Sequence, residues 1–124
     1  MHIKINISED SVIEESQYTN MLEEGVKPFP ILNIGRGSYI EEAFVDTVPD
    51  SLYIYNLQIG RYSSIAQNVN FMIDLDHDYR RVSQGRIPGS TYNRPEYIRR
   101  KGQIVIMNDC WIGANVTILG GVTI

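Results

Sequence analysis

An isoleucine returns every six residues in the last part of the chain, at Ile106, Ile112, Ile118 and Ile124. An α-helix repeats its apolar positions every 3.6 residues and a half-buried strand every second residue, so neither explains this spacing. A six-residue period is typical of a β-solenoid, in which each six-residue unit, or hexad, forms one side of a coil. The first residue of a hexad then points into a narrow core, and the fifth points inward near the corner.

The same period occurs twice upstream, which makes chance a poor explanation. One run starts hexads at Ile34 and Ile40, and a second run starts them at residues 53, 59, 65 and 71. The predicted inward fifth positions are Ser38, Phe44, Ser63, Val69, Cys110, Val116 and Val122. Nine hexads with three sides per coil predict about three coils of an all-β solenoid.

Residues 1–30 lack the period and form a predicted N-terminal extension to a domain of residues 31–124. The stretch from His2 to Ile7 alternates apolar and polar residues and predicts a short strand. Ser11 fits the start of a capping box, which predicts a short helix from Val12 to Glu24.

The longest interruption of the period is an excursion loop from Asp74 to Gly102, which contains His77. A loop of this length inside a compact domain is uncommon and is usually functional. Seven of the eight basic residues after residue 50 lie between Arg80 and Lys101. Such a basic stretch fits either a solvated surface or an anion-binding segment, and nothing in its spacing decides between them.

Composition places the chain among ordinary globular proteins. It has 124 residues, 43% hydrophobic and 21% charged, with a net charge of −4. There is no apolar run long enough to cross a bilayer and no signal-peptide core, so we expect no membrane span and a cytoplasmic location. Cys110 is the only cysteine, which excludes an intramolecular disulfide and fits a reducing compartment. Nucleic acid is not an expected partner.

Three stretches follow one another in a specific order: residues 59–66 (IGRYSSIA), residues 71–73 leading to Asp76-His77, and residues 108–113 (NDCWIG). With this order the chain, from about residue 34 onward, resembles the hexapeptide-repeat acyltransferases, in particular the xenobiotic (streptogramin-type) acetyltransferase branch. The resemblance implies a left-handed parallel β-helix (a hexapeptide β-solenoid) and a homotrimer with acetyl-CoA between neighbouring subunits. Because relatives continue for further coils, we expect the domain to be incomplete at its C-terminus.

Acetyl transfer from a thioester to a hydroxyl needs a base for the hydroxyl proton and a donor for the oxyanion. A histidine, with an ordinary pKa of about 6.5, suits the first task near neutral pH. The resemblance gives this role to His77, although Asp76 stands where the family usually has Asn. It also implies that Ala114 contacts acetyl-CoA and that Tyr39 lines the acceptor site. Trp111 is expected to contact acetyl-CoA as well, because a tryptophan at an outward hexad position marks a contact surface. Trp111 and Tyr39 occupy outward hexad positions, so plain surface residues are the alternative.

The resemblance therefore implies a CoA-dependent O-acetyltransferase that acts on a sugar or an antibiotic, with acetyl-CoA as co-substrate. The alternative is a non-catalytic β-solenoid scaffold or an inactive fragment. A solenoid zinc enzyme would need three histidines at each metal, and the chain has only His2 and His77, so no metal is expected. Cys110 falls on an inward fifth position, where a buried thiol would be inert rather than nucleophilic.

Overall fold

The structure, a computed structural model, describes residues 2–19, 29–47, 55–73, 75 and 101–124. These residues form ten strands and one short 3-10 helix, η1 (Glu9–Ser11), so the protein is all-β as predicted. The strands are β1 (His2–Ile7), β2 (Ser16–Thr19), β3 (Pro30–Ile34), β4 (Tyr39–Thr47), β5 (Leu57–Ile59), β6 (Ser64–Ile65), β7 (Val69–Ile73), β8 (Ile104–Ile106), β9 (Trp111–Ile112) and β10 (Thr117–Leu119).

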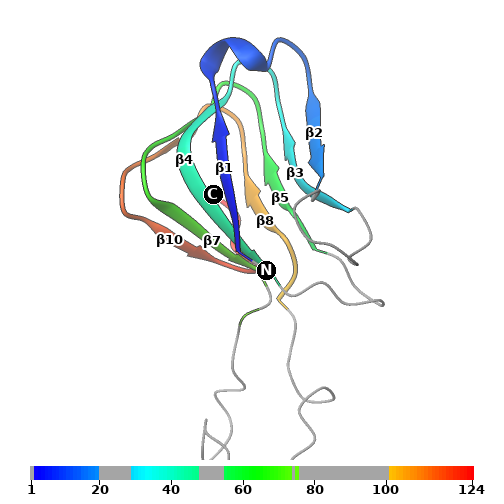
Figure 1. Ribbon diagram of the computed structural model, residues 1–124, viewed down its shortest axis with the longest axis vertical. Helices are drawn as coiled ribbons and strands as arrows, with labels where there is room; N and C mark the ends of the chain where they lie inside the picture. The colour runs from blue at the N-terminus through cyan, green and yellow to red at the C-terminus, as the bar shows by residue number, and fades with distance from the viewer. Residues whose placement is uncertain (1, 20–28, 48–54, 74, 76–100) are drawn as a thin grey trace, which may run out of the picture.

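Two sheets hold these strands. One is a four-stranded sheet of order β2-β3-β5-β8, and the other is a six-stranded sheet of order β10-β7-β4-β6-β9, with β1 added on β4. Figure 1 shows β3, β5 and β8 side by side next to the group of β4, β7 and β10. We call β3 and β4 coil 1, β5 to β7 coil 2, and β8 to β10 coil 3. Strands of successive coils pair in parallel because each coil repeats the path of the one before.

The strand register follows the six-residue period of the sequence. Residues at the first hexad position pair between coils 2 and 3. These pairs are Ile59 with Ile106, Ile65 with Ile112 and Phe71 with Ile118. Val105 bridges to Thr123, which stands three hexads later in the chain. Side chains at one hexad position are therefore stacked from coil to coil, as the period predicts.

The stacked first positions form the centre of the hydrophobic core, which also includes buried residues of the extension such as Ile3, Ile5 and Val12. Each of the first positions that the structure describes, apart from Ile124, is at most 6% exposed. They are Ile34, Ile40, Ile59, Ile65, Phe71, Ile106, Ile112 and Ile118. Because apolar area removed from water stabilises by about 25 cal/mol per Å², these three columns of stacked apolar side chains, one on each side of the coils, are a major source of stability. Tyr53, the first position of a ninth hexad, lies outside the described residues.

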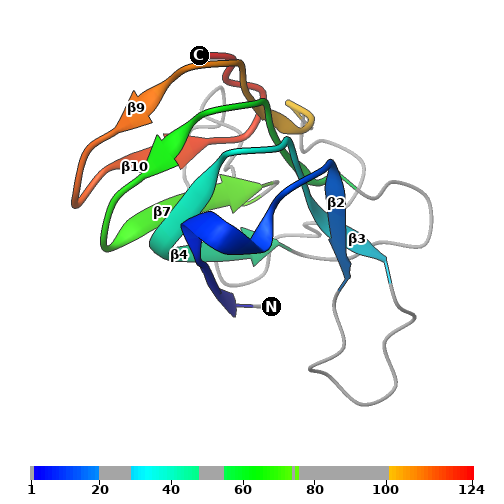
Figure 2. The same ribbon diagram turned by 90° about the horizontal axis from the view of Figure 1, so that it is seen from above.

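The corners between strands use the left-handed backbone region at the fourth hexad position. The residues with positive φ at this position are Gly37, Tyr62, Asn68, Asp109, Asn115 and Gly121. Glycine, asparagine and aspartate enter this region more readily than other residues do, which explains most of this set. Figure 2 shows the chain passing from β9 through such a corner into β10, with coil 2 following the same path to β7.

Two buried serines join the coils at the fifth position. Ser38 Oγ donates to the Gly60 carbonyl oxygen (2.7 Å) and accepts from the Ser63 N–H (2.9 Å). Ser63 Oγ donates in turn to the Met107 carbonyl oxygen (2.8 Å) and accepts from the Cys110 N–H (3.1 Å). Both serine side chains are fully buried, so these bonds satisfy backbone groups that water cannot reach.

The fifth-position prediction is wrong at two sites. Phe44 is partly exposed and stacks on the ring of His2, while Ala43 and Val45 are buried in its place. The cause is that this side of coil 1 is one residue shorter than the matching side of coil 2. Ile40 pairs with Ile65, but the next pair is Ala43 with Val69 rather than Phe44 with Val69. At the second site, Val122 is 38% exposed.

The predicted helix from Val12 to Glu24 is also wrong where the structure describes it. Residues 16–19 form β2, which pairs antiparallel with β3, and β1 pairs antiparallel with β4. Between them the Gly37 N–H donates to the Val12 carbonyl oxygen (2.9 Å). The extension thus covers the edge of coil 1, whose strands would otherwise present unpaired N–H and C=O groups. The predicted strand from His2 to Ile7 is confirmed.

Candidate functional site

Two of the predicted site residues share one outward row of the six-stranded sheet. Tyr39 pairs with Ser64, and Ser64 pairs with Trp111. Neighbouring strands lie about 4.8 Å apart, so the Tyr39 and Trp111 backbones are about 10 Å apart on one face. Trp111 is 81% exposed and Tyr39 is half-buried. The structure thus brings the two rings to one surface with a small serine between them.

Ala114 lies at the corner where the chain leaves β9 and is exposed. The next residue, Asn115, adopts a positive φ, and its side-chain oxygen accepts a hydrogen bond from Asn68 Nδ2 (2.8 Å). Ala114 and Trp111 are therefore close in the chain and both open to solvent, whereas no described contact links Ala114 to Tyr39.

His77 lies outside the described residues, and so do Asp76 and the basic residues from Arg80 to Arg100. The described chain ends β7 at Ile73 and, apart from Leu75, resumes at Lys101, just before β8. The roles of His77 and of the basic stretch stay predictions.

Cys110 is half-buried rather than buried, which corrects the expected environment of its thiol. It packs against the core, and Sγ lies 3.5 Å from the Asn108 carbonyl oxygen and 3.8 Å from that of Ile124. Among the described residues, no His, Asp or Glu contacts it to act as a base, so the thiol is not set up as a nucleophile.

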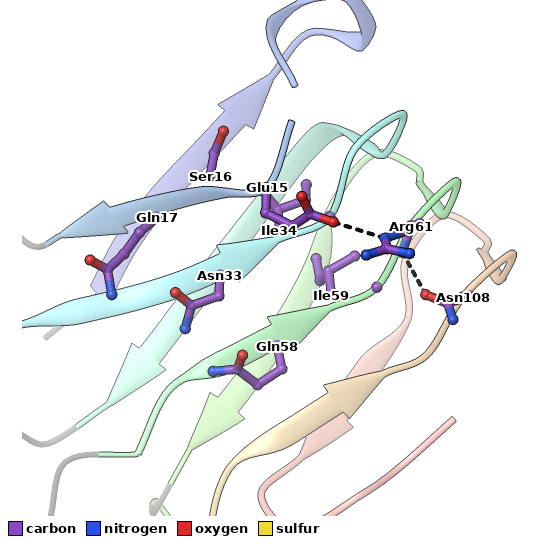
Figure 3. Close-up of a pocket in the computed structure, with 11 residues that line it drawn as sticks. Glu15, Ser16, Gln17, Asn33, Ile34, Gln58, Ile59, Arg61 and Asn108 are labelled. Carbon is purple, nitrogen blue, oxygen red and sulfur yellow. Dashed lines mark hydrogen bonds and ion pairs between the residues drawn. The ribbon is translucent and has the colours of Figure 1, made fainter. Parts of the chain in front are cut away.

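A groove of about 590 Å³ on the four-stranded sheet was missed by the sequence analysis. Its lining includes the side chains of Glu15, Ser16, Gln17, Asn33, Gln58, Arg61 and Asn108. Figure 3 shows the amides of Gln17, Asn33 and Gln58 following one another across adjacent strands, with Arg61 and Asn108 farther along the groove. This row is in register, because Asn33 pairs with Gln17 on one side and with Gln58 on the other.

One ion pair stands in the groove. Arg61 Nε donates to Glu15 Oε1 (2.8 Å), and the backbone N–H of Arg61 donates to Asn108 Oδ1 (2.8 Å). The pKa of Glu15 lies below its ordinary value of 4.5, first because a backbone N–H of its own residue bonds the carboxylate, and then because Arg61 bonds and attracts it. Glu15 is therefore ionised at neutral pH.

The six-residue period could have predicted part of this groove. Asn33 and Gln58 each precede a core isoleucine by one residue, the same outward position that Tyr39 and Trp111 occupy on the other sheet. Reading that position across coils finds the two stacked amides. Gln17 and Glu15 could not be found in this way, because they belong to the extension, which lacks the period.

Within the residues that the structure describes, no three His, Cys, Asp or Glu side chains gather as a metal site. No helix in this part of the chain is long and apolar enough to cross a bilayer. No family model matches the sequence, and searches of curated proteins and of solved structures return no significant match. The fold and the site together define an all-β protein of stacked parallel strands with one outward aromatic row and one polar groove.

Proposed function

We propose that this protein is a CoA-dependent O-acetyltransferase built on a left-handed parallel β-helix. The observation that carries the proposal is the stacking of coils in hexad register across the excursion loop. A coil without an insertion is three hexads long, as between Val105 and Thr123. Ile59 pairs with Ile106, and these two also stand three hexads apart once the loop from residue 74 to 102 is left out of the count. Two coils that keep hexad register on either side of a long histidine-bearing loop are what the acyltransferase resemblance implies.

The reaction needs one proton transfer and one acyl transfer. His77 takes the proton of the acceptor hydroxyl, whose oxygen forms a bond to the acetyl carbonyl carbon. The carbon–sulfur bond breaks, and the proton passes to the departing thiolate to give CoA. A backbone N–H stabilises the oxyanion, which is worth about 3 kcal/mol in comparable sites. Trp111 and Ala114 hold the acetyl-CoA arm, and Tyr39 lines the acceptor.

The same proposal includes a homotrimer with acetyl-CoA between subunits, acting in the cytoplasm. The trimer and the position of acetyl-CoA are supported by the outward row of Tyr39 and Trp111, because exposed aromatic rings offer area for a ligand or a second subunit to cover. Acceptors of the proposed class are hydroxylated sugars or streptogramin-type antibiotics.

The test replaces His77 by Ala and follows thiol release with amino sugars, galactosides and streptogramins as acceptors. General acid–base catalysis contributes about 10²–10⁴-fold, so we expect kcat to fall by that factor. The KM for acetyl-CoA should change little, because the histidine acts in the transition state. His2→Ala is the matched control: it removes the only other histidine, which lies on β1 and pairs with Asp46.

Full turnover by His77→Ala on any acceptor would remove the histidine from the mechanism. A protein that neither binds acetyl-CoA nor acetylates an acceptor would favour the non-catalytic scaffold. Calorimetric titration with acetyl-CoA distinguishes these outcomes, since loss of chemistry alone leaves binding intact.

A further inference from the structure

The groove on the four-stranded sheet presents side-chain amides whose hydrogen-bonding groups are mostly unused by the fold. Among the described residues, the side chains of Gln17 and Asn33 have no hydrogen-bond partner, and Gln58 uses only its Nε2, which donates to Asn56 Oδ1 (2.5 Å). Asn33 and Gln58 are half-buried and Gln17 is exposed. A free amide offers a carbonyl acceptor and two N–H donors, so the row presents both donors and acceptors to the groove.

This row differs from amides that serve the fold. At the corner after β6, Asn68 donates to Asn115 of the next coil (2.8 Å), so that pair ties two coils together. Asn33 and Gln58 also occupy equivalent positions on paired strands, yet no hydrogen bond joins their side chains. Stability therefore does not account for these amides, whose donors and acceptors face the groove.

The charge of the groove excludes strongly ionic ligands. Its lining carries one acid, Glu15, and one base, Arg61, and these two bond each other. Arg61 uses Nε for this bond, so its terminal nitrogens keep donors for a ligand. Phosphates are usually held by clusters of Arg and Lys, which this lining lacks. A neutral ligand with many hydroxyls fits better, because each hydroxyl both donates and accepts.

We propose that this groove binds a neutral saccharide, with the amides of Gln17, Asn33 and Gln58 and the guanidinium of Arg61 as hydrogen-bonding groups. The amide row spans three strands, or about 10 Å, and can meet the hydroxyls of successive sugar rings. The groove lies on the four-stranded sheet, whereas Tyr39 and Trp111 lie on the six-stranded sheet. Saccharide binding here does not depend on acetyl transfer.

The test titrates the isotope-labelled protein with maltose, lactose and N,N′-diacetylchitobiose and follows the side-chain NH₂ signals of Asn33 and Gln58 by NMR. We expect at least one of these sugars to shift both signals, with a Kd on the order of 1 mM, as suits an open groove. Asn33→Ala and Gln58→Ala should each raise that Kd about three- to tenfold, the equivalent of one lost hydrogen-bonding group.

Asn70→Ala is the matched control, because Asn70 is a half-buried outward amide on β7 of the other sheet. This variant should leave the Kd unchanged. The proposal is overturned if none of the three sugars shifts the Asn33 and Gln58 signals, or if Asn70→Ala weakens binding as much as Asn33→Ala. Tighter binding of glucose 6-phosphate than of glucose would assign the groove to anions instead. The His77→Ala variant should bind the sugar with unchanged Kd, so a failure of the proposed acetyl transfer can be distinguished from a failure of saccharide binding.

Discussion

At the scale of single residues, the contact between Glu15 and Arg61 joins the N-terminal extension to coil 2. Glu15 immediately precedes β2, and Arg61 lies in the corner between β5 and β6. Both side chains are about half exposed, so the contact adds little to stability. Its value is positional, because it fixes the guanidinium at one end of the amide row.

The lowered pKa of Glu15 gives a prediction in pH. The carboxylate of Glu15 takes up a proton near pH 4.5 in the unfolded chain and only at lower pH in the folded protein. The ionised carboxylate therefore stabilises the folded state fully above pH 4.5, and this stabilisation is lost as pH falls through the folded pKa. NMR titration should place the Glu15 midpoint below 4.5. Arg61→Gln should raise it part of the way, because the backbone hydrogen bond is the larger cause and remains.

Arg36→Gln serves as the control for Arg61→Gln, since Arg36 acts on Glu15 only through space and most weakly. An equal rise of the midpoint in the two variants would mean that Arg61 does not bond the carboxylate.

At the scale of elements, the corners decide how closely coils approach. A Cβ added at Gly60 would lie 2.5 Å from Asn108 Oδ1 and 2.7 Å from the Met107 carbonyl carbon. Gly35 meets the backbone of Gly60 in the same way, with the Gly60 carbonyl carbon at 2.7 Å. These glycines let each coil rest on the next. Gly113 follows its isoleucine at the same hexad position, but nothing lies within 4 Å of an added Cβ.

Gly60→Ala should therefore destabilise the protein, and Gly113→Ala should not. We expect Gly60→Ala to lower the free energy of unfolding by about 1–3 kcal/mol, the usual cost of overpacking. Gly113→Ala should be neutral or raise it by up to about 1 kcal/mol, because alanine restricts the unfolded chain. Urea denaturation measures both values. Similar losses in the two variants would contradict the close approach of the coils at Gly60.

At the scale of the whole molecule, the strand ends that border the gaps in the described chain lie at one edge of the sheets. The described chain breaks off after β2, β4 and β7 and resumes before β3, β5 and β8. The ends of β4 and β7 pair at Thr47 and Ile73, and the starts of β5 and β8 pair at Leu57 and Ile104. Figure 1 shows these ends together at the lower edge of the sheets. The strands on either side of these gaps thus keep their register.

Trp111 reports on the proposed acetyl-CoA site because it is the only tryptophan in the sequence. Its exposure of 81% predicts strong quenching of its fluorescence by acrylamide in the free protein. Saturating acetyl-CoA should lower the quenching constant, because the bound arm would cover the ring. Free N-acetyltryptophanamide with the same acetyl-CoA concentration controls for direct effects on fluorescence. If bound acetyl-CoA leaves the quenching unchanged, Trp111 is not part of the cofactor site.

The sequence by itself determined the repeated part of the core and the stacking of coils. A six-residue period needs only local information, because every hexad repeats the same inward position. That position is occupied by Ile59, Ile65, Phe71, Ile106, Ile112 and Ile118. The outward placement of Trp111 and Tyr39 follows from the same period. Their chemical role does not follow from the period, because the period specifies which way a side chain points and not which molecule it contacts.

The tertiary structure alone decided what happens where the period fails. The capping-box pattern at Ser11 predicted a helix from Val12 onward, but the edge of β3 offers backbone hydrogen bonds, and Ser16–Thr19 become strand β2. Phe44 turns outward because its side of coil 1 is one residue short. The groove depends on this pairing of the extension with coil 1. The pairing brings Glu15 to Arg61, which is far from it in the sequence, and no local pattern specifies this contact.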